Sequence, residues 1–177
     1  ALVAASVVSF NTNASNKVVY GDDNRVDVFA SSNSMYVELS KSTAAMIPAS
    51  SLKKAMNGEF NVSGRSLAAR GMCKTERFAQ QKSAANCSGF LVGEDLLVTA
   101  GHCVRSQSAC AQYKWVFDYK VSYEDQFDFT VPANSVYSCK NIITTVLDRS
   151  TMDDYALIKL DRKVTDRRSL DFRTSGK

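Results

Sequence analysis

The chain has 177 residues, of which 45% are hydrophobic and 23% are charged, and its formal net charge at pH 7 is +4. This composition is that of an ordinary soluble globular protein with enough apolar residues to bury a core. The basic excess is small, and clusters such as Arg167-Arg168 have no interleaved aromatic residues, so the sequence gives no support for a nucleic-acid partner.

The first 82 residues are expected to differ from the rest of the chain. Residues 1–17 are rich in Ala, Ser and Asn and show no periodicity, which predicts a leader or pro-segment. The apolar run Ala1–Phe10 is too short to span a bilayer, so no membrane partner is expected. Residues 18–82 are expected to form an N-terminal strand and an extension that packs on the following domain.

This extension is expected to contain a short helix. In the tract 51–56, a serine cap precedes Leu52, Ala55 and Met56, and Gly58 provides a stop. The tract 42–47, with the sequence Ser-Thr-Ala-Ala-Met-Ile, fits either a helix or a strand of a barrel.

Residues 83–177 are expected to fold as one small all-β barrel. Aromatic and β-branched residues alternate with polar ones in the tracts 114–121 and 136–146, which is typical of half-buried strands. No repeat or low-complexity linker divides this region, and about 95 residues suit a single small β domain.

The only histidine of the chain, His102, follows a short apolar strand. Imidazole is the side chain best suited to moving protons near neutral pH. The tripeptide Cys87-Ser-Gly, followed by Thr99-Ala-Gly-His-Cys103, resembles the histidine region of trypsin- and chymotrypsin-like serine proteases. The resemblance implies an all-β double-barrel fold, a general-base role for His102 and a Cys87–Cys103 disulfide beside it. The alternative is a hairpin with an incidental histidine.

A second segment, Asp154-Tyr-Ala-Leu-Ile-Lys-Leu160, resembles the aspartate strand of the same family. That resemblance implies that Asp154 accepts the Nδ1 proton of His102 and orients the ring. Asp153 is the competing carboxylate, but the family pattern selects the residue directly before Tyr155. The alternative is a solvated start of a strand, because aspartate is unfavourable inside strands.

The serine expected of such a protease is missing. No Gly-x-Ser-Gly occurs in these 177 residues, since Ser88 and Ser175 each precede a glycine but lack the glycine two positions earlier. In the family, the histidine and aspartate come from a first six-stranded barrel and the serine from a second. The resemblance therefore implies that this chain supplies the N-terminal half only. The expected partner is a second chain or C-terminal half that carries the serine, with cleavage after Lys177.

Five cysteines at spacings that fit no thioredoxin motif favour an oxidising compartment, so secretion or the periplasm is expected. Cys110 and Cys139 flank the aromatic strand and are expected to pair. Cys73 then remains, either as a free thiol or as a tether to the missing half. A zinc site is a poor fit because no Cys-x2–4-Cys pair is present, and no metal or cofactor is expected.

The segment Val18–Arg25 resembles the mature start of bacterial glutamyl-endopeptidase-like members of the superfamily. This resemblance implies an activation cleavage at Lys17–Val18, as in a zymogen. The alternative is an ordinary strand over 18–29 with a polar turn at 21–24.

The function expected from these motifs is that of a secreted serine endopeptidase acting on peptide or protein substrates through an acyl-enzyme. His102 and Asp154 are the expected catalytic residues. The alternative is a catalytically inactive protease-like binding module.

Overall fold

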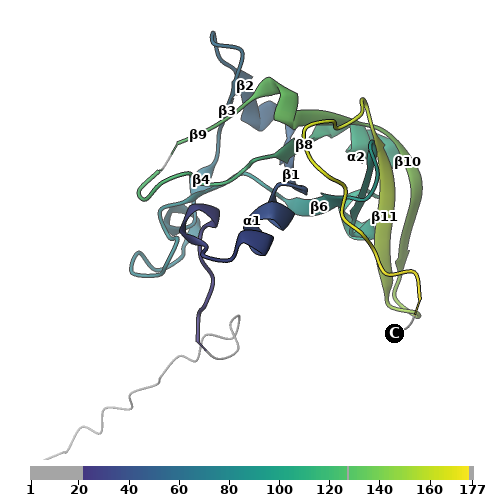
Figure 1. Cartoon of the computed structure of the whole chain (residues 1–177), viewed down its shortest axis with the longest axis horizontal. Helices are drawn as coiled ribbons and strands as arrows, with labels where there is room; N and C mark the ends of the chain where they lie inside the picture. Colours follow the sequence, from purple (N-terminus) through teal and green to yellow (C-terminus); the bar gives the residue numbers. More distant parts are fainter. Residues whose placement is uncertain (1–21, 127, 176–177) are drawn as a thin grey trace, which may run out of the picture.

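A computed structural model describes residues 22–126 and 128–175. Six strands form a closed antiparallel barrel in the order β1-β6-β7-β11-β10-β8, which confirms the predicted all-β architecture. The barrel strands are β1 (Thr43–Pro48), β6 (Cys87–Leu91), β7 (Leu96–Thr99), β8 (Tyr113–Phe117), β10 (Val136–Asp148) and β11 (Asp153–Leu160). Figure 1 shows the long β10–β11 hairpin along one side of the barrel.

The barrel begins earlier than residue 83, the boundary expected from sequence. Strand β1 lies within the region expected to be an extension, and it closes the barrel by pairing with both β6 and β8. Its side chains explain this position, since Met46 is buried in the barrel core and Ile47 is buried in a second cluster. The tract that fitted either a helix or a strand is therefore a strand.

Two smaller sheets lie outside the barrel. Strands β2 (Leu52–Lys54), β3 (Phe60–Val62) and β9 (Phe129–Val131) form the first, and β4 (Arg65–Ser66) pairs with β5 (Lys82–Ser83) in the second. The helix predicted over 51–56 is wrong, because this tract forms β2 and Leu52 pairs with Val62, which is buried. Cross-strand burial outweighs the weak local preference for a helix.

The helices are short and lie elsewhere. Helix α1 (Ser34–Ser40) is capped at its N-terminus by Asn33, whose side chain accepts hydrogen bonds from the amides of Met35 and Tyr36. Helix α2 is Gln107–Gln112, and the 3-10 turns are η1 (Val28–Ala30), η2 (Ala49–Ser51), η3 (Ala68–Arg70), η4 (Gly101–Cys103) and η5 (Ala133–Ser135). Residues 22–27 contain no helix or strand, and Val18 lies outside the described residues.

The core is divided by β8. Trp115 and Phe117 point into the barrel, whereas Val116 belongs to a second apolar cluster that includes residues of the β2-β3-β9 sheet. Alternate residues of one strand thus serve two cores, which is why β8 is buried on both faces. Gly89 leaves the space that Trp115 fills, since a Cβ there would lie 2.9 Å from the indole.

Two disulfides connect neighbouring elements. Cys87–Cys103 joins β6 to the η4 turn, and Cys110–Cys139 joins α2 to β10. Both pairings agree with those expected from the sequence. Cys73 is exposed and has no disulfide partner. The prediction of an unpaired Cys73 is therefore confirmed, whereas its proposed role as a tether stays a prediction.

The segment after β11 runs back across the barrel. Its main anchor is Arg167, whose side chain is 6% exposed and forms an ion pair with Asp118 at 2.9 Å. Burial raises the pKa of the Asp118 carboxyl, but hydrogen bonds from Arg167 and Ser135 outweigh burial and hold that pKa below its ordinary value. The same guanidinium donates to the carbonyl of Lys41, next to β1.

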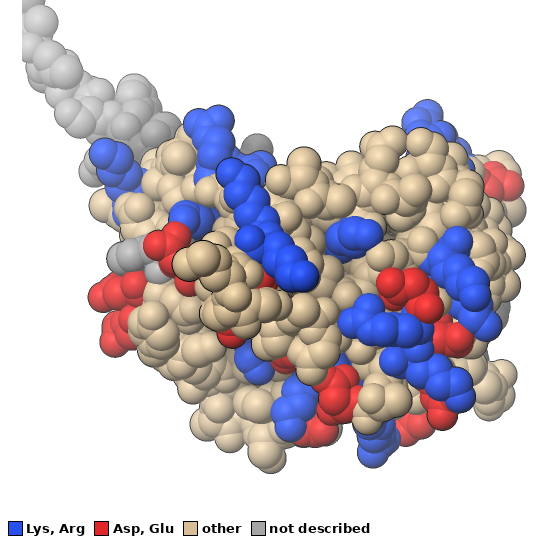
Figure 2. Space-filling model, turned by 90° about the horizontal axis from the view of Figure 1, so that it is seen from above, with Lys and Arg blue, Asp and Glu red and all other residues tan. Residues whose placement is uncertain are grey.

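The surface carries charges of both signs. On the lower half of the face in Figure 2, acidic side chains lie among basic ones. Several charged side chains of the chain form exposed ion pairs, such as Lys163 with Glu94 at 2.5 Å. Pairs of this kind contribute at most about 1 kcal/mol each. Within the described residues, no helix has the length and apolar character needed to cross a membrane.

Candidate active site

Strand pairing brings His102 and Asp154 together across 52 residues of sequence. β7 pairs with β11 so that Thr99 lies opposite Ala156. Extending this antiparallel register by two residues brings Asp154 opposite Gly101, the residue before His102. The η4 turn begins there, and it turns the histidine toward the carboxylate.

Asp154 holds His102 at two points. The Nδ1 atom lies 2.6 Å from Oδ2, and the His102 backbone amide donates to Oδ1 at 2.8 Å. A proton on Nδ1 satisfies this contact and leaves Nε2 unprotonated, with a free lone pair. The hydrogen bond from the His102 side chain lowers the pKa of the Asp154 carboxyl most, and the bond from the His102 amide lowers it further. Together they hold this pKa below its ordinary value.

The pair faces solvent. The His102 side chain is 58% exposed and that of Asp154 is 37% exposed. Within the described residues, Nε2 has no hydrogen-bond partner, so it is open to a group that approaches from outside. The arrangement can accept a proton at Nε2 while the carboxylate stabilises the resulting imidazolium.

The competing carboxylate, Asp153, does not take part in this contact. Its carboxylate accepts a hydrogen bond from the Thr151 hydroxyl at 2.6 Å, at the turn of the β10–β11 hairpin. Successive residues of a strand point to opposite faces, so only one of the two aspartates can face His102. The structure brings Asp154 to that position.

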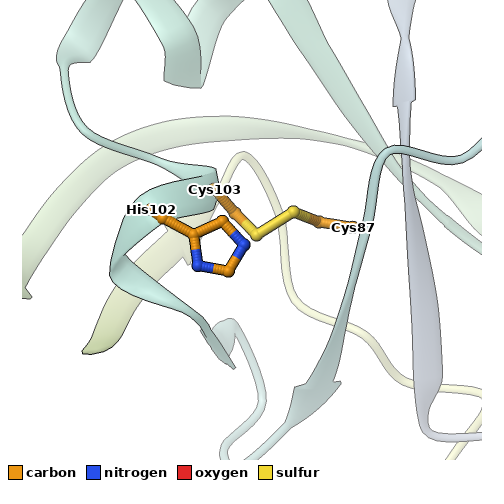
Figure 3. A group of neighbouring side chains, drawn as sticks. All are labelled: Cys87, His102 and Cys103. Atoms are coloured by element: carbon orange, nitrogen blue, oxygen red, sulfur yellow. A yellow bond between two sulfur atoms is a disulfide. The ribbon is translucent and has the colours of Figure 1, made fainter. Parts of the chain in front are cut away.

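A disulfide braces the histidine turn (Figure 3). The sulfur atoms of Cys87 and Cys103 lie within 4.8 Å of a ring nitrogen of His102, a spacing that could hold a metal ion. Both sulfurs are bonded to each other, however, and the thiolate is the form of cysteine that binds metals. With the disulfide intact, this cluster offers one metal ligand, the imidazole.

The structure brings no serine to the pair. Ser88 is on β6, where its backbone carbonyl accepts a hydrogen bond from the Thr99 hydroxyl at 2.7 Å. Neither Ser88 nor any other serine among the described residues forms a hydrogen bond with the His102 ring. Among the described residues, the site therefore contains a histidine and an aspartate bonded to it but no serine in contact with them.

An apolar groove of about 590 Å³, which sequence reasoning missed, lies on the outer wall of the barrel. It crosses four barrel strands, β6, β7, β10 and β11, and the C-terminal segment. Its main lining residues are Phe90, Leu96, Val98, Tyr155, Leu157 and Phe172. The lack of apolar–polar alternation in β7 and over residues 155–158 of β11 is a signal that could have identified it, because apolar residues lie there on the outward face as well as on the core face.

Comparison with known families supports the same interpretation. A family model, described as Trypsin, matches residues 63–172, which is more than half of the chain. The matched range includes His102, Asp154, both disulfides and every barrel strand except β1. No curated protein shows a significant sequence match to the chain. The match, together with the closed barrel and the paired histidine and aspartate, shows that this chain belongs to the trypsin family.

Proposed function

We propose that the chain is the histidine- and aspartate-bearing half of a secreted serine endopeptidase. Its trypsin-family domain supports a protease function and peptide or protein substrates. The observation that carries the proposal is the two-point contact between His102 and Asp154, which fixes the tautomer and leaves Nε2 open.

In the proposed reaction, His102 Nε2 removes the proton from a serine hydroxyl as its oxygen attacks the scissile carbonyl. The imidazolium then gives this proton to the leaving amine, the C–N bond breaks, and an acyl-enzyme remains. Water repeats the sequence, releases the carboxylic acid and restores the serine. Asp154 stays ionised throughout, in agreement with its lowered pKa.

The serine and the oxyanion hole are proposed to lie outside residues 1–177, in a second barrel on a continuing or separate chain. The apolar groove supports this proposal, because a continuous apolar surface on the wall of the barrel is favourable to cover. We further propose that Cys73 provides the tether if the halves are separate chains. A non-reducing gel checks this: one larger band that persists in Cys73→Ser would contradict it.

The finer assignments rest on the cysteine pairs and on a short motif near the N-terminus. Secretion or a periplasmic location is proposed from the disulfides, which persist in oxidising compartments. Activation at Lys17–Val18 and membership of the glutamyl-endopeptidase-like group are proposed from residues 18–25. N-terminal sequencing of active protein tests the activation site, and a start other than Val18 would contradict it.

A catalytically inactive binding module remains the second candidate function. One observation favours it: these residues contain the pair but no nucleophile. In that case the groove and the exposed imidazole would bind a protein partner without cleaving it.

A serine-directed phosphonate distinguishes the two functions. We expect the full-length native protein, with its partner chain if it has one, to form a covalent adduct on a serine. His102→Ala is expected to slow labelling by about 10⁴-fold or more, and Asp154→Asn by about 10⁴-fold. Asp153→Asn is the matched control and should label normally. An unlabelled wild-type protein, or labelling that does not depend on His102, would contradict the proposed endopeptidase.

A further inference from the structure

The basic residues of the chain are unevenly distributed. The segment 52–83, from the start of β2 to the end of β5, contains seven of the 22 basic residues and two of the 18 acidic ones, which gives it a net charge of +5. The remaining 15 basic and 16 acidic residues give a net charge of −1. The excess positive charge of the whole chain therefore lies in this one segment.

Most of the basic side chains in this segment have no acidic partner. Arg77 pairs with Asp23 at 3.5 Å. Lys82 pairs with Asp128. The other five are exposed and form no ion pair within the described residues, and they make up a basic surface: Lys53, Lys54, Arg65, Arg70 and Lys74. Like charges that lie close together repel each other, and an anionic partner relieves this repulsion.

A backbone hydrogen bond holds the two ends of this surface together. The Ser63 amide, after β3, donates to the Ser51 carbonyl, before β2, at 2.8 Å. Lys53 and Arg65 are each two residues from this contact, so their backbones lie within about 20 Å of each other. Figure 2 views the molecule from the side on which Figure 1 places β2 and β3, and basic side chains cross the upper half of this face, where few acidic ones lie. One extended polymer can therefore contact several of these charges at once.

Two arginines of the basic surface are held in place by backbone carbonyls. Arg70 donates to the Ser83 carbonyl at 2.7 Å. Arg65, which lies opposite Ser83 in the β4–β5 pair, donates to the Ala69 carbonyl. A guanidinium has five N–H donors in a rigid fork, so each arginine keeps donors free for an anion while its side chain is already ordered. Carboxylate and phosphate groups match that fork, and sulfate has the same tetrahedral shape as phosphate.

We propose that the basic surface binds an acidic polysaccharide, a flexible polymer that carries sulfate or carboxylate groups. The segment 52–77 has one aromatic residue, Phe60, and its side chain packs against the second apolar cluster. Single-stranded nucleic acids are bound by aromatic stacking and protein partners by aromatic anchors, and this surface offers neither. The oxidising compartment proposed above favours a polymer found outside cells. This choice of polymer rests on the proposed secretion and not on the proposed protease activity.

Binding of a fluorescein-labelled sulfated dextran to the full-length native protein tests this proposal. We expect the logarithm of the association constant to fall with the logarithm of the salt concentration with a slope between about −3 and −4, since about five charges are neutralised. The triple variant Lys53→Gln, Lys54→Gln and Lys74→Gln removes three lysines whose side chains form no hydrogen bond within the described residues. It should weaken binding by about 100-fold.

The matched control removes the same charge from exposed side chains elsewhere, through Lys140→Gln, Arg149→Gln and Arg173→Gln. Because salt screens charges that are not in contact with the polymer, this variant should weaken binding by less than about 5-fold. Trp115 is the only tryptophan of the chain and is fully buried in the barrel, so unchanged Trp115 emission shows that both variants are folded.

Each outcome decides the proposal. Absence of binding to the sulfated dextran, or equal losses in the two triple variants, would overturn it. Neutral dextran should not bind. Tighter binding of duplex DNA or of poly-glutamate would also overturn it, because the partner would then be a nucleic acid or an acidic protein. Phosphonate labelling and detection of the protein outside the cell are separate measurements, so failure of the proposed activity or secretion is distinguishable from failure of binding.

Discussion

Asp154 is the residue whose charge determines how His102 is held. Its two oxygens accept hydrogen bonds from the ring and from the backbone amide of the same histidine. Protonation of the carboxyl would weaken both contacts at once. The orientation of the base should therefore depend on pH in the acid range.

The first prediction follows from this linkage. The folded-state pKa of Asp154 lies below the ordinary value of 3.8, so its ionisation stabilises the fold above about pH 4 and this contribution is lost as the pH falls through the folded-state pKa. Asp154→Asn should therefore lose less stability than wild type between pH 5 and pH 2. Urea unfolding followed by Trp115 fluorescence measures this.

The control for that measurement is Asp153→Asn, which changes the neighbouring carboxylate. Asp153 contacts Thr151 and not His102, so this variant should keep the acid dependence of the wild type. Equal acid dependence in Asp154→Asn and wild type would contradict the linkage.

Among the elements, the C-terminal segment is held by a buried charged side chain, in addition to the buried Val164 and its backbone hydrogen bonds to the barrel. Arg167 contacts Asp118 after β8 and the carbonyl of Lys41 before β1, and it lies over the Phe117 ring. One guanidinium thus joins the ends of two barrel strands to a segment without secondary structure of its own.

We therefore expect Arg167→Ala to destabilise the fold by about 3 kcal/mol, because it removes the guanidinium that hydrogen-bonds to the partly buried Asp118 carboxylate and leaves only the Lys120 ammonium, at 3.8 Å. Arg168→Ala is the matched control: its side chain is 74% exposed, its partner Asp171 is also exposed, and the loss should stay below about 0.5 kcal/mol. Urea unfolding of the two variants compares them. Equal destabilisation would show that the Arg167 network contributes nothing of its own.

The elements also show how much the sequence could predict. Strands β7 and β11 and the His102–Asp154 pair were predictable, because their residues match family motifs and antiparallel pairing then fixes the distance. The helix over 51–56 failed because Leu52 has a cross-strand partner, Val62, which local spacing cannot reveal. Helix α1 was missed because its seven residues span only about two turns, which is too short for a clear periodic signal.

For the whole molecule, the main question is what covers the apolar groove. Tyr155 is 47% exposed in this chain, whereas a protein surface rarely leaves a continuous apolar patch uncovered. If the proposed second half packs there, the groove should be protected in the full-length protein.

Hydroxyl-radical footprinting of the full-length protein tests this prediction. Tyr155 should be oxidised several-fold more slowly than Tyr36 and Tyr123, which are exposed on other parts of the molecule. Phe172 should likewise be protected relative to Phe29. Oxidation of Tyr155 at the rate of the two reference tyrosines would show that the groove is open to solvent and would favour the binding-module alternative.

Closure of the barrel by β1 has a consequence for where the folded unit starts. The range similar to the trypsin family begins at residue 63, but β1 ends at residue 48. A polypeptide trimmed to that range would leave β6 and β8 with open edges, whose free amide and carbonyl groups are templates for pairing with other chains. Strand β1 thus covers both of these edges, and we expect a unit that folds without aggregating to include residues 43–48, outside the range of family similarity.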